Sequence, residues 1–225
     1  MPSLNPMVLL VLSDLTRRSA DGSFKALSKA DGAMRVLHVS RGCLINSESP
    51  VVSERLGNML AAEGRLDPVL IEPVANEARK RGTLLGHQLI ADGLLTPTDL
   101  ASALERQARL RLENAMASSG TVTLVASVGV EPMVRIPLEG AVTAAFRKRI
   151  NLQAIRDSIA ERPKQPLALD LKAEVFTRLE LGPSELRVCR ELAAGKSLDA
   201  VLAGSTSPDS VLRLVGVLVA LGLWA

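Results

Sequence analysis

The sequence has 225 residues, of which 47% are apolar and 2% aromatic, and its net charge is +3. This length suits one elaborate domain or two small ones, with a core built mainly from Leu, Val and Ala. The scarcity of aromatic side chains argues against a surface that stacks on bases or sugars. The small positive charge is compatible with an anionic partner but does not require one.

Two cysteines, Cys43 and Cys189, lie far apart in the chain, and neither belongs to a CxxC pair. They form no metal or redox pattern, and a reducing compartment suits them. The N-terminus has no basic segment before its apolar stretch, which argues against a signal peptide. The most apolar window, 211–224, contains Arg213 and is too short to cross a bilayer. We therefore expect a cytoplasmic protein without a membrane span.

The first part of the chain predicts a helix followed by a small β-meander. Residues 4–16 are mostly apolar and predict the helix, while 23–28, 34–39 and 43–46 predict three short strands. Turn residues at 30–33 and 41–42 separate those strands. After the meander, 53–117 predicts helices only, 121–128 a strand, and 138–160 a further helix.

The second part of the chain predicts helices beyond a linker. Residues 162–166 include two prolines and suit a linker, so we expect domains at 1–160 and 170–225 joined by 161–169. Within the C-terminal domain, three short helices and an apolar, strand-like tip predict a winged-helix-like unit. The predicted fold class is therefore α+β: a small antiparallel β-sheet, a tandem two-helix repeat and a C-terminal winged-helix-like helical unit.

The tandem repeat occupies 53–110, where two segments align without a gap at a constant spacing. Gly57 and Gly86 are separated by the same number of residues as Gly64 and Gly93, as expected for repeated supersecondary units. Each copy predicts a short helix, a glycine that ends it, and a capped second helix beginning with proline. The other equivalent positions are Leu56 and Leu85, Leu60 and Leu89, Leu66 and Leu95, Asp67 and Thr96, and Pro68 and Pro97.

The pattern RLGxxLxxxGxL resembles the repeated motif of the N-terminal MshEN domain of type II secretion and type IV pilus ATPases. The matching residues are Arg55, Leu56, Gly57, Leu60, Gly64 and Leu66 in the first copy, and Leu85, Gly86, Leu89, Gly93, Leu95 and Gln107 in the second. The resemblance implies that these residues bind cyclic di-GMP. Two positions depart from the motif: Ala78 stands where Gln is expected, and Leu84 where Arg is expected. Each copy therefore keeps one polar end and lacks the other.

The order of elements over 4–157 is similar to that of the PATAN-type domain of bacterial signalling proteins. It comprises an opening helix, a meander ending in Gly42–Ile45, the two repeats, then a strand and a helix carrying Arg147–Arg149. The resemblance implies a protein–protein interaction module, in some cases tied to motility and surface behaviour. No cofactor follows from it.

Other features carry weaker functional expectations. The third C-terminal helix offers Arg213 as its one polar base-reading group, so it suits packing or a homodimer contact better than entry into a DNA groove. His38 and His87 are expected to be histidines at the edge of the core, without partners for a triad or a zinc site. Arg106, Arg109 and Arg111 could form a basic groove with Arg55.

The sequence predicts no enzyme, because it contains no acid–base pair, nucleophile motif or metal cluster. Our leading interpretation is a non-catalytic bacterial signalling adaptor that binds a protein partner. The alternatives are a cyclic di-GMP receptor and a transcription regulator that binds DNA through its C-terminal unit. Nucleic-acid binding is the least expected of these.

Overall fold

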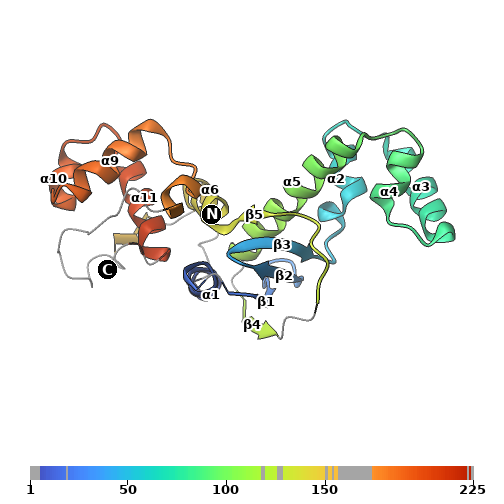
Figure 1. The fold of residues 1–225 in the computed structure, drawn as a ribbon, viewed down its shortest axis with the longest axis horizontal. Coiled ribbons are helices and arrows are strands. Elements are labelled where there is room, and N and C mark those ends of the chain that lie inside the picture. The colour runs from blue at the N-terminus through green and yellow to red at the C-terminus, as the bar shows by residue number, and fades with distance from the viewer. Residues whose placement is uncertain are drawn as a thin grey trace.

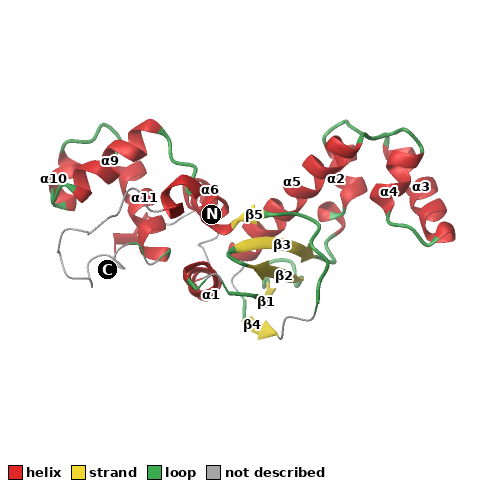
Figure 2. Cartoon of the chain, viewed as in Figure 1, coloured by secondary structure: helices red, strands yellow, loops and turns green. Residues whose placement is uncertain are grey.

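A computed structural model provides the fold, and it describes residues 6–18, 20–117, 120–125, 129–149, 152–153, 155–156, 174–221 and 223. Helices pack against one antiparallel five-stranded sheet, so the predicted α+β class is confirmed (Figure 2). The predicted linker, 161–169, and the ends of the chain at 1–5 and 224–225 lie outside the described residues. Within those described, no helix combines the length and apolar character needed to cross a membrane.

The sheet has the strand order β4-β1-β2-β3-β5. The predicted meander forms β1 (Gly22–Leu27), β2 (Met34–Ser40) and β3 (Cys43–Glu48), and β4 (Val122–Val125) joins the free side of β1. The prediction had β4 extending to residue 128, but 126–128 lie outside the described residues. The sheet also contains a strand that the sequence does not predict, β5 (Ile136–Pro137), paired with β3.

One face of the sheet carries the main core. Alternating strand residues on that face are fully buried, among them Phe24, Leu37 and Leu44. The helices α1 (Pro6–Arg17), α5 (Pro97–Met116) and α6 (Leu138–Arg149) pack against this face and one another. The predicted helix 138–160 is therefore present up to residue 149, with 152–153 and 155–156 also helical.

The repeat region projects from the sheet as a group of short helices (Figure 1). A single 3₁₀ turn, η1 (Val52–Glu54), leads into α2 (Leu56–Ala62), α3 (Pro68–Arg81) and α4 (Leu85–Ala91). The long helix α5 then runs from the repeat back to the sheet. The predicted two-helix units are thus α2 with α3, and α4 with α5.

The C-terminal helices lie at the opposite end of the molecule from the repeat (Figure 1). They are α8 (Glu174–Arg178), α9 (Pro183–Ala193), α10 (Leu198–Ala203) and α11 (Pro208–Ala220). The apolar residues of α11 enter the main core against α6 and α1, so this end of the chain shares its core with the sheet. The three predicted helices are present, while the predicted strand-like tip falls mainly outside the described residues.

Candidate functional site

The two copies of the repeat have the local structure that the sequence predicts. Asp67 caps α3 by accepting a hydrogen bond from the backbone N–H of Val69 (2.9 Å). Thr96 caps α5 by accepting from the N–H of Asp99 (3.1 Å), and Asp99 completes a capping box. These bonds satisfy N–H groups that a helix start otherwise leaves without a partner.

The glycines that end the first helix of each copy occupy the left-handed region. Gly64 and Gly93 both have φ of 69°. This conformation is strained for a residue with a Cβ, and nothing else lies within 4 Å of where one would be. Both glycines are therefore required by the backbone, and a ligand is not needed to explain them.

The glycines of the RLG motif are explained differently: they allow two helices to pack closely. A Cβ on Gly57 would lie 3.0 Å from Ile71 Cγ2, and one on Gly86 would lie 2.8 Å from Leu100 Cδ1. Ile71 and Leu100 are equivalent positions of the two copies. Each motif glycine thus lets the first helix of its unit approach the second.

The apolar residues of both motifs build a small core of their own, separate from the main core. Its buried members form three equivalent pairs: Leu60 and Leu89, Leu66 and Leu95, and Val74 and Ala103. Leu56 and Leu85 pack against them and remain partly exposed. The leucines predicted as ligand contacts therefore hold the two units together.

The polar ends of the two motifs differ in their surroundings. Gln107 is 7% exposed, and its side chain donates to the backbone carbonyl of Glu54 (2.8 Å). Arg55 sits at the N-cap of α2, is exposed, and makes no side-chain hydrogen bond or ion pair with any described residue. At the equivalent positions of the other copy, Leu84 is 59% exposed and Ala78 is buried.

The starts of the two motifs do lie next to each other. Leu85 Cδ2 is 3.5 Å from the position a Cβ would take on Gly57. A hydrogen bond also connects the 3₁₀ turn to the start of α2, because the Asn58 side chain donates to the backbone carbonyl of Val52 (2.8 Å). Val52 and Arg55 lie just before the helix of the first motif and Leu84 just before that of the second, and we call these three residues the repeat face. Val52 and Leu84 are each 59% exposed.

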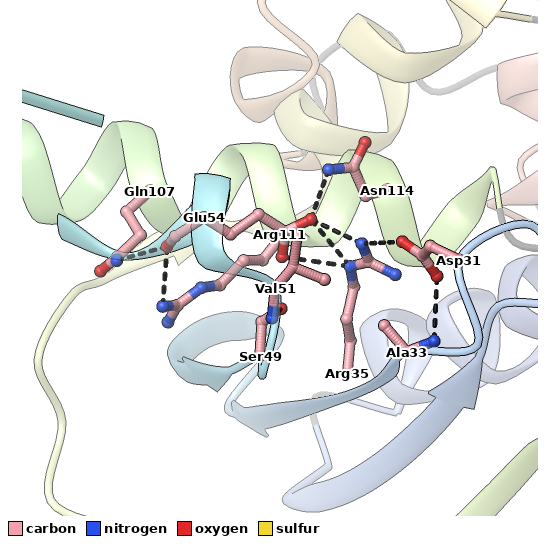
Figure 3. A network of polar contacts seen from close by, with 9 residues as sticks. All are labelled: Asp31, Ala33, Arg35, Ser49, Val51, Glu54, Gln107, Arg111 and Asn114. Atoms are coloured by element: carbon pink, nitrogen blue, oxygen red, sulfur yellow. Dashed lines mark hydrogen bonds and ion pairs between the residues drawn. The ribbon is translucent and has the colours of Figure 1, made fainter. Parts of the chain in front are cut away.

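A buried polar network centred on Glu54 joins the repeat to the sheet (Figure 3). The Glu54 carboxylate accepts from Arg35 on β2 (2.6 Å) and from Asn114 on α5 (2.7 Å). Arg111 donates to the backbone carbonyls of Glu54 (2.9 Å) and Ser47 (2.5 Å). Glu54 and Arg35 are 2% and 3% exposed. A buried pair of this kind is tolerated because other hydrogen bonds satisfy both charges.

The network sets the charge state of its carboxylates. Burial by itself would raise the pKa of Glu54, but hydrogen bonds from Arg35, Ser49 and Asn114 outweigh it and hold the pKa below its usual value. The hydrogen bond from Arg35 lowers the pKa of Asp31 to about 2. Burial lowers the pKa of Arg111. The sequence offers one signal for this network, a charged residue, Arg35, inside a mostly apolar strand.

The basic groove expected from the arginines of α5 does not form, since each one is engaged elsewhere. Arg106 bonds Glu63 through two nitrogens, and Arg109 pairs with Glu105 and lies 3.7 Å from Glu180. Arg111 belongs to the network. These three side chains tie α5 to three different parts of the molecule and leave no shared positive face with Arg55.

The two histidines have different surroundings. His38 is 8% exposed; its Nδ1 is 2.7 Å from Ser23 Oγ and its Nε2 is 3.3 Å from Glu48 Oε1. Ser23 is 1% exposed, so its hydroxyl is closed to a substrate, and this row links three strands. His87 is exposed on α4, which corrects the expectation that it lies at the core edge. Over the described residues, no cluster of three His, Cys, Asp or Glu suits a metal ion.

The third C-terminal helix, α11, faces mainly the interior of the protein. Its residues Val211, Leu212 and 214–218 are buried, and Arg213 Nη1 donates to the backbone carbonyls of Phe146 and Arg147. Most of these buried side chains belong to the main core.

Scans against protein-family models, curated proteins and solved structures each find no match to the chain.

Proposed function

We propose that the chain is a non-catalytic bacterial signalling adaptor that binds another protein through the repeat face. The observation that carries this proposal is the pair of exposed apolar side chains, Val52 and Leu84, at the adjoining starts of the two motifs. The small core of the repeat is complete without them. Two apolar side chains that the fold does not use are then available to a partner.

The position of Leu84 strengthens the proposal. Leu84 is the N-cap of α4, where Ser, Thr, Asp or Asn would accept a backbone hydrogen bond and stabilise the helix by about 1 kcal/mol. Leucine gives up that stabilisation and exposes an apolar side chain instead. At the equivalent position of the first copy, Arg55 presents an exposed guanidinium without an acidic partner among the described residues. The chemistry that fits this face is an apolar contact flanked by a carboxylate.

The test places a photo-crosslinking amino acid at position 84 in cells, with the same substitution at Leu124, 64% exposed on β4, as the matched control. We expect one discrete adduct from position 84 and none from position 124. The captured protein is then purified and its affinity measured. Leu84→Glu should weaken binding at least tenfold, about 1.4 kcal/mol, whereas Leu124→Glu should not. Equal affinities for the two variants would reject the repeat face.

A second candidate is a cyclic di-GMP receptor, which Arg55 favours because it begins the first motif, whose Gly57 lies against Leu85 of the second. Calorimetry at high micromolar protein and nucleotide decides between the two. If the chain is a receptor, the wild type should give heat of binding and Arg55→Ala should give none. The adaptor hypothesis expects no heat with either protein. Arg55→Ala is the informative variant, since Gln107 is already bonded to Glu54.

A further inference from the structure

The turn between β2 and β3 contains an arginine in an unfavourable conformation. Arg41 has φ of 49° and Gly42 has φ of 70°, which makes the connection a two-residue turn with two left-handed residues. Asn, Asp and Gly are the residues that such a turn prefers in its first position. Asp21 Oδ1 accepts a hydrogen bond from the Arg41 backbone N–H (3.1 Å), which supports the turn. Any residue except proline has this N–H and could make the same bond. The fold therefore does not require the arginine side chain here.

That side chain lines a pocket of about 240 Å³, bordered by Ser40, Arg41, Ile45, Pro132, Val134 and Arg135. Leu44 and Ile136 are register partners and fully buried on the core face of the sheet. Ile45 follows Leu44 where the register between β2 and β3 shifts, and Arg135 immediately precedes β5. The pocket therefore lies at the β3–β5 edge of the sheet, and none of its lining residues belongs to the repeat face.

The pocket presents two positive charges against an apolar wall. The side chains of Arg41 and Arg135 are exposed, and neither forms a hydrogen bond or ion pair with any residue in the described ranges. The Asp21 carboxylate accepts hydrogen bonds from the Ser40 hydroxyl and the Arg41 backbone N–H, and its negative charge offsets part of the Arg41 charge. Ile45, Pro132 and Val134 supply the apolar wall.

We propose that this pocket binds a small organic phosphate monoester. Guanidinium groups recognise phosphate oxygens through paired N–H donors. A monoester carries about −1.5 to −2 charges at pH 7, which two arginines can match. The apolar wall accommodates the organic part of the ligand. This site is independent of the protein partner proposed above, and either can be rejected without the other.

The test is an NMR titration of the ¹⁵N-labelled full chain with phenyl phosphate at constant ionic strength. Saturable shifts are expected at the amides of Gly42, Ile45 and Val134. Arg135→Gln should weaken binding at least about tenfold. Arg41→Asn should weaken it as much, yet leave the melting temperature equal to or above that of the wild type, because Asn suits the turn better.

Two controls fix the interpretation. Arg190→Gln removes an exposed arginine on α9 and should leave the shifts unchanged. Benzoate carries the same ring on a carboxylate and should bind more weakly than phenyl phosphate. Absence of saturable shifts in the wild type, or affinity retained in Arg41→Asn, would overturn the site. Equal binding of benzoate would overturn its assignment to phosphate.

Discussion

Gln107 on α5 donates a hydrogen bond to the backbone carbonyl of Glu54, and the distance is 2.8 Å. Arg111, four residues later on the same helix, donates to the same oxygen at 2.9 Å. The residue before the first RLG motif is therefore held by the last polar residue of the second. Gln107, which the MshEN resemblance implies as a ligand contact, is part of the bonding between the repeat and the rest of the fold.

Gln107→Ala should lower the free energy of unfolding by about 1–2 kcal/mol, since a buried hydrogen bond is lost while Arg111 still satisfies the carbonyl. Steric disruption is not expected, because the equivalent residue of the first copy is a buried alanine, Ala78. Urea unfolding gives the measurement. Ser102→Ala, at an exposed position of α5, is the control and should change stability by less than about 0.5 kcal/mol. Equal effects of the two substitutions would contradict the structural role of Gln107.

Glu54→Gln should cost about 3–5 kcal/mol of unfolding free energy, because it leaves the buried Arg35 guanidinium with a reduced share of negative charge. Glu63→Gln is the matched control: it breaks the ion pair with Arg106 at the protein surface and should cost less than about 1 kcal/mol. Both are measured by urea unfolding at pH 7. Similar losses for the two variants would show that the Glu54 network contributes no more than a surface pair.

Stability should fall as the pH is lowered below about 4.5, the ordinary pKa of a glutamate. The folded-state pKa values of Glu54 and Asp31 both lie below their ordinary values, that of Asp31 at about 2. Their contribution is therefore fully present above those ordinary values and is lost as protonation reaches the folded state. Asp31→Asn should flatten the decline between pH 4.5 and 2, and Asp209→Asn, at an exposed position on α11, should follow the wild type. A decline as steep in Asp31→Asn as in the wild type would contradict this assignment.

Gly86→Ala should destabilise the protein by about 1–2 kcal/mol, although alanine is the better helix former, because its Cβ would meet Leu100 at 2.8 Å. Leu100→Val removes the crowding methyl groups. In that background Gly86→Ala should become neutral, and the double-mutant cycle should give a coupling of about 1–2 kcal/mol. Additive effects in urea unfolding would mean that glycine is needed at position 86 for a reason other than its contact with Leu100.

Cys189 should resist alkylation in the native state at pH 8. Its side chain is fully buried, and burial raises the pKa of its thiol to about 11, so the reactive thiolate is scarce. The Cys43→Ser variant isolates this thiol for mass spectrometry after treatment with iodoacetamide. Rapid modification without denaturant would contradict the buried position, whereas modification in urea is expected.

The repeat is the part of the fold that the sequence predicts best. Gly64 and Gly93, with the caps Asp67 and Thr96, are local signals whose conformations depend little on the rest of the chain. The meander is predictable for the same reason. The two-residue strand β5 is too short for any periodicity, and it exists because the chain returns beside β3.

The candidate site is less accessible to sequence reasoning, because its contacts join distant residues. Arg35 meets Glu54 only once β2 and η1 are placed together. The motif resemblance implies Gln107 as a ligand contact, whereas in the structure its side-chain amide donates to the backbone carbonyl of Glu54. The spacing of the α5 arginines in the sequence suggests a common groove. In the structure they do not form one, because each binds a different partner.

The 20-residue helix α5 belongs to both cores at once. Near its start, Ala103 lies in the core of the repeat; near its end, Leu112, Ala115 and Met116 lie in the main core. Over its length of about 30 Å, the helix is one uninterrupted series of hydrogen bonds. We therefore expect the repeat and the main core to open together, so the amides of Ala103 and Leu112 should exchange with solvent deuterium through the same opening event. A protein held on the repeat face would slow exchange at both ends of α5, including the end beneath the sheet.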